Sequence, residues 1–154
     1  MIATTIIGIG SPYGDDQVGW LAIDHLQQQW ADQPELTFMK SNSLDWLTEI
    51  NQAEQVFFID AVVSDQPPGK IHAFPIKHAL PGHLKLNTSS HGISLWESIQ
   101  LAQNLSDFDL PIYFFGIEIQ PEQTLLCHPK DANLWRSTLT QQVVQQLAKP
   151  TPWN

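Results

Sequence analysis

Residues 6–20 read Ile-Ile-Gly-Ile-Gly-Ser-Pro-Tyr-Gly-Asp-Asp-Gln-Val-Gly-Trp, an apolar segment that passes through glycines and two aspartates into a helical pattern. The apolar part, residues 3–9, is rich in β-branched side chains and therefore predicts a buried parallel strand. Gly8 and Gly10 allow the backbone to turn sharply, and Pro12 prevents further strand pairing. These residues together predict a strand, a tight loop and a helix in direct succession.

Two adjacent carboxylates, Asp15 and Asp16, lie in this loop. Ligands of open α/β sheets bind where such a loop follows the first strand. The dinucleotide fingerprint is disfavoured because Tyr13 stands in place of its third glycine and because Asp15 and Asp16 would face the phosphates. The chain also has no Gly-Lys-Ser/Thr phosphate loop. One aspartate suffices to cap a helix. Because adjacent helical side chains point about 100° apart, the second carboxylate is available for another role.

Length and charge exclude several classes of protein. A chain of 154 residues with 42% hydrophobic content predicts one globular domain, residues 1–154. A net charge of −9 with only seven basic residues argues against binding to nucleic acid or to an anionic membrane surface. The single cysteine, Cys127, excludes an internal disulfide and a cysteine-based zinc site. Without a long apolar run or a signal-type N-terminus, we expect a cytoplasmic protein.

Strong strand patterns alternate with amphipathic helical patterns along the chain. The predicted strands are residues 3–9, 55–59 and 110–116, with a shorter one at 36–39 and an edge strand at 70–75. The predicted helices are residues 17–30, 44–51, 131–149 and one that ends near 105 behind a capping box formed by Ser94 and Glu97. This order predicts an α/β fold: a three-layer, phosphorylase/hydrolase-like domain with a mainly parallel mixed sheet and helices on both faces.

Three polar residues are predicted to meet at one edge of that sheet. Asp16 lies in the first loop, Asp60 directly follows the second strong strand, and His91 precedes a helix. Two carboxylates and an imidazole form an oxygen–nitrogen ligand set that leaves open positions on a divalent metal ion. The same residues also suit a metal-free hydrolase in which an acid orients the histidine, but that alternative lacks a nucleophile.

The remaining candidates for chemistry are weaker. No Gly-x-Ser-x-Gly elbow is present. Cys127 is followed directly by His128, and sequence neighbours seldom form a nucleophile–base pair, so we interpret Cys127 as a small, partly buried, space-filling residue. His72 alternates with apolar neighbours on the predicted edge strand and is expected to face solvent. His78 and His83 are interpreted as ordinary surface residues of a loop.

Four segments, in this order along the chain, resemble the nickel–iron hydrogenase maturation endopeptidases. They are Gly-Ile-Gly-Ser-Pro-Tyr-Gly-Asp-Asp-Gln-Val-Gly at 8–19, Phe-Ile-Asp-Ala at 58–61 with the later Pro-Gly-Lys-Ile, Ser-Ser-His-Gly at 89–92, and Phe-Phe-Gly-Ile-Glu-Ile-Gln-Pro at 114–121. The resemblance implies a mixed α/β sheet with helices on both faces. It also implies that Asp16, Asp60 and His91 form the metal-binding and catalytic triad of the family.

The activity implied by the resemblance is removal of a C-terminal peptide from the hydrogenase large-subunit precursor after nickel insertion. Nickel would then arrive with the substrate, and the free enzyme need not hold a metal. Two alternatives are a non-catalytic nickel-sensing binding or chaperone module and an unrelated metal-dependent peptidase. The sequence differs from the family pattern at Ser11, where asparagine is usual, in a first loop one residue shorter, and at residues 40–44, which replace a Gly-Gly-Thr-like segment.

Overall fold

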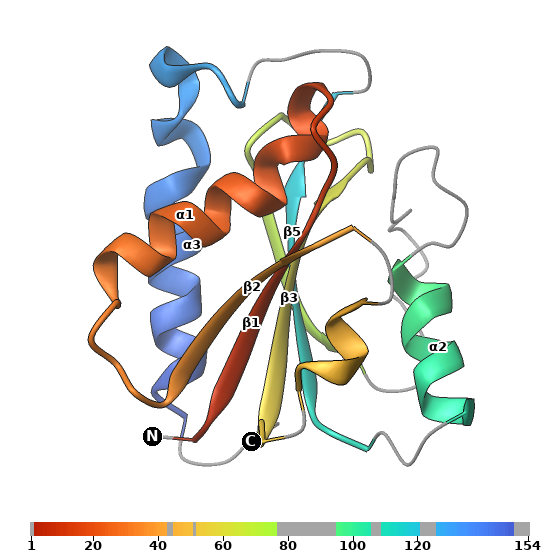
Figure 1. Cartoon of the computed structure of the whole chain (residues 1–154). Coiled ribbons are helices and arrows are strands. Elements are labelled where there is room, and N and C mark those ends of the chain that lie inside the picture. The colour runs from red at the N-terminus through yellow and green to blue at the C-terminus, as the bar shows by residue number, and fades with distance from the viewer. Residues whose placement is uncertain are drawn as a thin grey trace.

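A five-stranded sheet in the order β2-β1-β3-β5-β4 runs through the centre of the computed structural model (Figure 1). The structure describes residues 2–42, 45–50, 52–76, 95–105, 109–120 and 126–149. The strands are β1 (Thr4–Ile9), β2 (Leu36–Ser41), β3 (Gln55–Val62), β4 (Ile71–Ile76) and β5 (Ile112–Glu118). β1 pairs in parallel with β2 and β3, and β3 with β5, whereas β4 runs antiparallel to β5 at one edge. The mainly parallel mixed sheet with β1, β3 and β5 inside is therefore confirmed.

Helices cover both faces of this sheet (Figure 1). The α-helices are α1 (Val18–Gln29), α2 (Leu95–Leu105) and α3 (Asn133–Leu147), and the 3-10 turns are η1 (Gly14–Gln17), η2 (Asp45–Thr48) and η3 (Pro129–Asp131). Apolar side chains of α1 and α3 share one core cluster with Phe57 and Phe115. Those of α2 and η2 share the other with Phe58 and Phe114. Two cores on opposite faces of one sheet confirm the three-layer α/β architecture.

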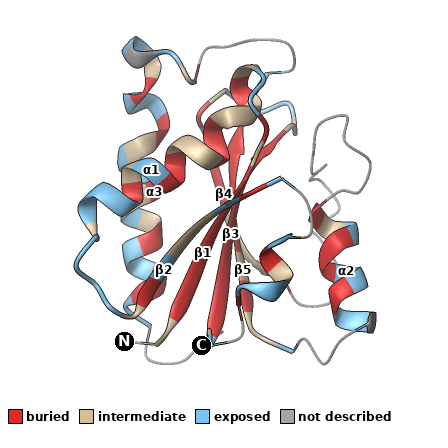
Figure 2. Ribbon diagram, in the orientation of Figure 1, coloured by how far each residue is buried: buried red, intermediate tan, exposed pale blue. Residues whose placement is uncertain are grey.

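The alternation of side chains along the strands produces these two cores. Successive strand residues point to opposite faces, so Phe57 and Phe58, both fully buried, enter different cores. Figure 2 shows the buried residues concentrated along the central strands and on the inner sides of the helices. Trp46 of η2 is also fully buried and packs edge-on against Phe58 at 5.0 Å between ring centroids.

Several element ends differ from the prediction. The first helix begins as the 3-10 turn η1 before α1, and the predicted helix at 44–51 is only the turn η2 among the described residues. β4 continues through Pro75, because an edge strand tolerates the missing N–H of a proline. The segment that contains Ser94 of the predicted capping box lies outside the described residues. In the described part of the chain, no helix has the length and apolar character needed to cross a bilayer.

Candidate functional site

Two glycines bring the start of α1 against the end of β1. A Cβ atom added to Gly8 would lie 2.2 Å from the carbonyl oxygen of Gly19. One added to Gly19 would lie 2.0 Å from the carbonyl oxygen of Ile9 and 3.0 Å from that of Ile59 on β3. A larger residue at either position would therefore displace backbone. This contact fixes the loop with the two aspartates over the carboxyl ends of β1 and β3, at the end of the sheet where α1 begins (Figure 1).

Hydrogen bonds close this loop on itself. The N–H of Ser11 donates to the carbonyl of Asp16 at 3.2 Å, and the N–H of Asp16 donates to the carbonyl of Tyr13 at 3.1 Å. The Ser11 hydroxyl, at 3.5 Å from Asp16 Oδ2, lies at the limit of a hydrogen bond. Asp16 is half-buried and Ser11 is buried. The Asp16 carboxylate is therefore carried by a turn that backbone hydrogen bonds close on itself.

Asp15 has a different role from its neighbour. Its side chain is buried, and Oδ1 accepts hydrogen bonds from the backbone N–H groups of Leu126 at 3.0 Å and Cys127 at 3.3 Å. These bonds tie the β1–α1 loop to a segment more than 100 residues later in the chain. Asp15 therefore anchors the β1–α1 loop and makes no capping hydrogen bond at the start of η1 or α1. Its Oδ2 is buried and has no hydrogen-bond partner among the described residues.

Asp60 lies inside β3 and not after it. The prediction that the strand ends at residue 59 is wrong, because Asp60, Ala61 and Val62 continue the pairing with Gly116, Ile117 and Glu118 of β5. Asp60 is only 3% exposed. Its Oδ1 accepts a hydrogen bond from the N–H of Ala61 at 2.7 Å, whereas its buried Oδ2 has no hydrogen-bond partner among the described residues.

The surroundings of Asp60 oppose its negative charge. Burial raises the pKa of Asp60 well above its ordinary value, since the carboxylate is removed from water. The hydrogen bond from Ala61 acts in the opposite direction, and the charge of Asp16 raises the pKa further. The structure thus places the two predicted acids close enough to interact. A divalent cation fits this pair, because it would fill the open acceptor of Asp60 and reduce the repulsion between the carboxylates.

The third predicted ligand, His91, lies outside the described residues. Within the described ranges, no three histidine, cysteine, aspartate or glutamate side chains are grouped so that they could hold a metal ion. The meeting of Asp16 and Asp60 with His91 therefore remains a prediction. His78 and His83 also lie outside the described residues.

His72 is buried, so the prediction that it faces solvent is wrong. The side chain is 8% exposed, and its Nε2 lies 2.9 Å from Oε1 of Glu118, which is 1% exposed. Glu118 Oε2 also accepts the N–H of Ser64 at 2.7 Å, and the Ser64 hydroxyl donates to Oε1. An edge strand was expected to leave one face in water, but the segment around Ser64 and the end of β5 cover this one.

Ser64, His72 and Glu118 have the composition of a catalytic triad but not its geometry. The Ser64 hydroxyl lies 3.4 Å from Nε2 of His72, the same nitrogen that contacts Glu118. A triad needs the acid on one ring nitrogen and the serine on the other, so that the histidine can pass a proton between them. The cluster is therefore a structural hydrogen-bonded group that fastens the segment after β3 to β5. Sequence reasoning missed it because Glu118 is 46 residues from His72.

Cys127 does not have the surroundings of a nucleophile. Partial burial raises the pKa of its thiol, and contact with the Asp15 carboxylate raises it further, so the thiol form is favoured. The side chain is neither fully buried nor fully exposed. The partial burial predicted for Cys127 is confirmed.

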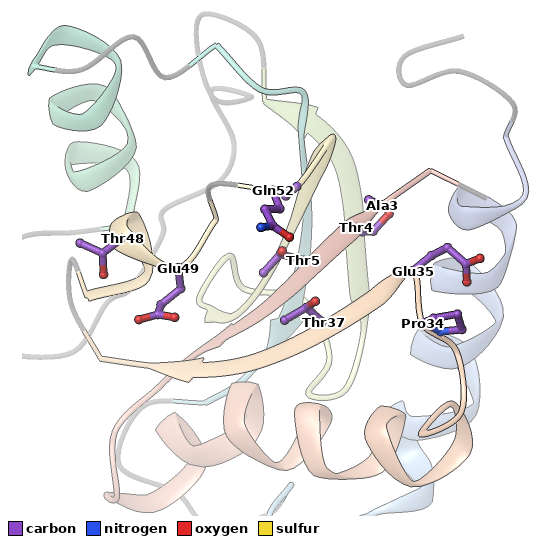
Figure 3. Close-up of a pocket in the computed structure, with 10 residues that line it drawn as sticks. Ala3, Thr4, Thr5, Pro34, Glu35, Thr37, Thr48, Glu49 and Gln52 are labelled. Atoms are coloured by element: carbon purple, nitrogen blue, oxygen red, sulfur yellow. The ribbon is translucent and has the colours of Figure 1, made fainter.

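A polar pocket of about 330 Å³ lies at the amino ends of β1 and β2, where it opens between these strands and η2 (Figure 3). Its lining residues are Ala3, Thr4, Thr5, Pro34, Glu35, Thr37, Thr48, Glu49, Gln52 and Ala53. Neither Asp16 nor Asp60 is among them. The pocket is thus separate from the pair of acids at the carboxyl ends of the strands.

Comparison with solved structures identifies the fold. The [NiFe] hydrogenase maturation protease HybD from Thermococcus kodakarensis aligns with a TM-score of 0.71 at 18% identity over 96% of this chain and 100% of that chain. HycI, a [NiFe] hydrogenase maturation protease from Thermococcus kodakarensis KOD1, aligns with a TM-score of 0.66 at 20% identity over 94% and 91% of the two chains. The hydrogenase maturating endopeptidase HybD from E. coli gives 0.63 at 16% identity over 94% and 91%.

No protein-family model and no curated protein matches the sequence. At these identities the structural likeness establishes a shared fold. The proteins that share it belong to the same family that the four sequence segments resemble.

Proposed function

We propose that this protein is an endopeptidase that removes a C-terminal peptide from the nickel-loaded precursor of a nickel–iron hydrogenase large subunit. The environment of Asp60 is the main support: a buried carboxylate near the carboxyl end of β3 that feels the charge of Asp16 and whose Oδ2 has no hydrogen-bond partner in the described parts of the chain. The shared fold adds to this, since its solved examples include maturation proteases for hydrogenases.

Nickel enters this reaction as part of the substrate. Asp16 and Asp60 would offer carboxylate oxygens to the ion on the precursor, and His91 would offer a ring nitrogen. The two carboxylates repel each other. A cation that arrives on the substrate would reduce this repulsion and would therefore stabilise the enzyme–substrate complex. A precursor without nickel would leave that repulsion in place. The enzyme would therefore select loaded precursors.

Hydrolysis requires a water molecule near the peptide carbonyl, and nickel on the precursor can polarise that carbonyl. Asp60 is suited to accept a proton from the water, since burial holds its pKa above that of an exposed carboxyl. The water oxygen forms a bond with the carbonyl carbon, and the carbon–nitrogen bond then breaks. Asp60 returns the proton to the departing amine, so that protons balance over the cycle.

The test is a two-by-two assay with purified protein. Wild type and His91→Ala are each incubated with nickel-loaded and nickel-free precursor, and cleavage is followed as a loss of mass. We expect cleavage only by wild type on loaded precursor. Cleavage of nickel-free precursor by wild type would instead indicate a conventional hydrolytic site. Co-elution with loaded precursor without cleavage would support the nickel-sensing binding module.

A matched pair of aspartate variants tests the role of the site acids. Asp60→Asn removes the charge and the base at nearly constant volume, so we expect cleavage to fall by a factor of about 10³ or more. Asp32→Asn makes the same change on an exposed turn and should cleave at the wild-type rate. Equal rates for the two variants would remove Asp60 from the mechanism.

A further inference from the structure

Tyr13 is the most exposed of the large hydrophobic side chains that the structure describes, at 68%. The others in this group are Leu134 at 55%, Val144 at 46% and Leu101 at 37%, all on helices. Tyr13 instead lies in the β1–α1 loop, three positions before Asp16. A large and mostly exposed aromatic residue thus lies in the same loop as Asp16.

The backbone that carries this ring is held from several sides. The carbonyl of Tyr13 accepts the N–H of Asp16 at 3.1 Å, and the N–H of Tyr13 lies 3.5 Å from the Ser11 hydroxyl. The ring of Pro12 fixes the φ angle of the residue before Tyr13. Asp15 fastens the following turn to the backbone of Leu126. Hydrogen bonds within the loop therefore set the position of the Tyr13 backbone relative to that of Asp16.

An exposed tyrosine on a hydrogen-bonded loop has the properties of a binding hot spot. Tyrosine supplies a large contact area at a low cost in conformational entropy, since only two side-chain angles must be ordered. Such side chains dominate binding when they fill a pocket near the centre of an interface. An isolated exposed aromatic elsewhere would carry no such meaning. This one is coupled by a backbone hydrogen bond to an acid of the candidate site.

From this placement we propose that Tyr13 is the docking anchor for the folded precursor: its ring inserts into an apolar recess of the precursor beside the segment to be cut. This role rests on the proposed function and adds the mode of substrate recognition. Tyr13 is a binding residue and takes no part in proton transfer. The enzyme thereby recognises a folded surface in addition to the metal and the peptide.

The test uses Tyr13→Ala, Tyr13→Phe and, as a control for loss of an exposed apolar side chain, Val144→Ala on α3. Binding of nickel-loaded precursor is measured by calorimetry, and cleavage is measured in parallel. Loss of a hot-spot side chain typically weakens binding about 30-fold or more. We expect that loss in Kd and KM for Tyr13→Ala, with kcat unchanged. Tyr13→Phe retains the ring, and Val144→Ala lies elsewhere, so both should stay within about twofold of wild type.

The two readouts separate failure of this inference from failure of the proposed function. If wild type cleaves the precursor and Tyr13→Ala has the same KM, the docking role is wrong and the peptidase function stands. If wild type binds without cleaving, the peptidase function fails, and the Kd of Tyr13→Ala still decides the docking role. A wild type that neither binds nor cleaves overturns both. A fall in kcat for Tyr13→Ala at wild-type KM would also contradict the docking role.

Discussion

Asp60 and Glu118 are both buried carboxylates on the face of the sheet that α2 covers, yet their partners differ. Glu118 contacts the ring of His72 and accepts the N–H and the hydroxyl of Ser64, so both of its oxygens are used. Asp60 accepts one hydrogen bond at Oδ1, and its Oδ2 has no partner in the described parts of the chain. Burial alone therefore does not distinguish these two acids, whereas their hydrogen-bond partners do. Asp15 also has a buried Oδ2 without a hydrogen-bond partner in the described parts of the chain, so an unfilled oxygen marks a candidate only together with a neighbouring charge such as that of Asp16.

The charge around each carboxylate leads to the same distinction. Glu118 faces an imidazole that can carry a positive charge. Asp60 has the second acid, Asp16, as its electrostatic neighbour, and the charge of Asp16 adds to the effect of burial on the pKa of Asp60. The chain itself satisfies Glu118, whereas Asp60 is held in a state that an incoming cation or proton would stabilise.

Removal of each carboxylate should separate the two roles most clearly. Glu118→Ala leaves the Ser64 and His72 donors without their acceptor in a buried place, so we expect a loss of about 3–5 kcal/mol in the free energy of unfolding. Asp60→Asn keeps a polar side chain and removes a poorly solvated charge, so stability at neutral pH should be unchanged or higher. Urea denaturation of both variants measures these changes. A larger loss for Asp60→Asn than for Glu118→Ala would reverse the comparison.

The pH dependence of stability gives a second, smaller contrast. Because the pKa of Asp60 is raised in the folded state, its protonated form stabilises the fold at low pH. That contribution is complete below the unfolded pKa of about 3.9 and is lost as the pH rises through the folded pKa. The free energy of unfolding of wild type minus that of Asp60→Asn should therefore fall with rising pH, by at most about 1.4 kcal/mol per unit.

Urea titrations of wild type and Asp60→Asn at several pH values above 4 measure this difference. Glu118→Gln is the matched control, because it also removes a buried charge but at a carboxylate whose acceptors are filled. Parallel stability curves for wild type and Asp60→Asn would show that burial does not shift the titration of Asp60.

The sequence predicted the central strands well because a continuous apolar run must be covered on both faces, which places the strand inside the sheet. The apolar residues 56–59 alternate between the two cores, so neither face of this strand could be exposed. The end of β3 was missed because Asp60 is polar, and a polar residue in a buried strand is satisfied only by tertiary context. For the same reason the sequence identified Asp16 and Asp60 as candidates but not the filled and open oxygens that distinguish Asp60 from Glu118. His72 was misplaced because its partner on β5 is distant in sequence.

The smallest effect is expected at Cys127, which contacts a third buried carboxylate, Asp15. Its Oδ1 accepts two backbone N–H groups, and it also contacts the Cys127 thiol. If Asp15 is structural like Glu118 and no thiolate takes part in cleavage, Cys127→Ser should change little, since a hydroxyl can replace the thiol as a donor. We expect less than about 1 kcal/mol of change in stability and cleavage of loaded precursor within about twofold of wild type. Denaturation and the cleavage assay measure both quantities on one preparation. A large loss of cleavage at normal stability would show that Cys127 belongs to the site and that Asp15 acts with it.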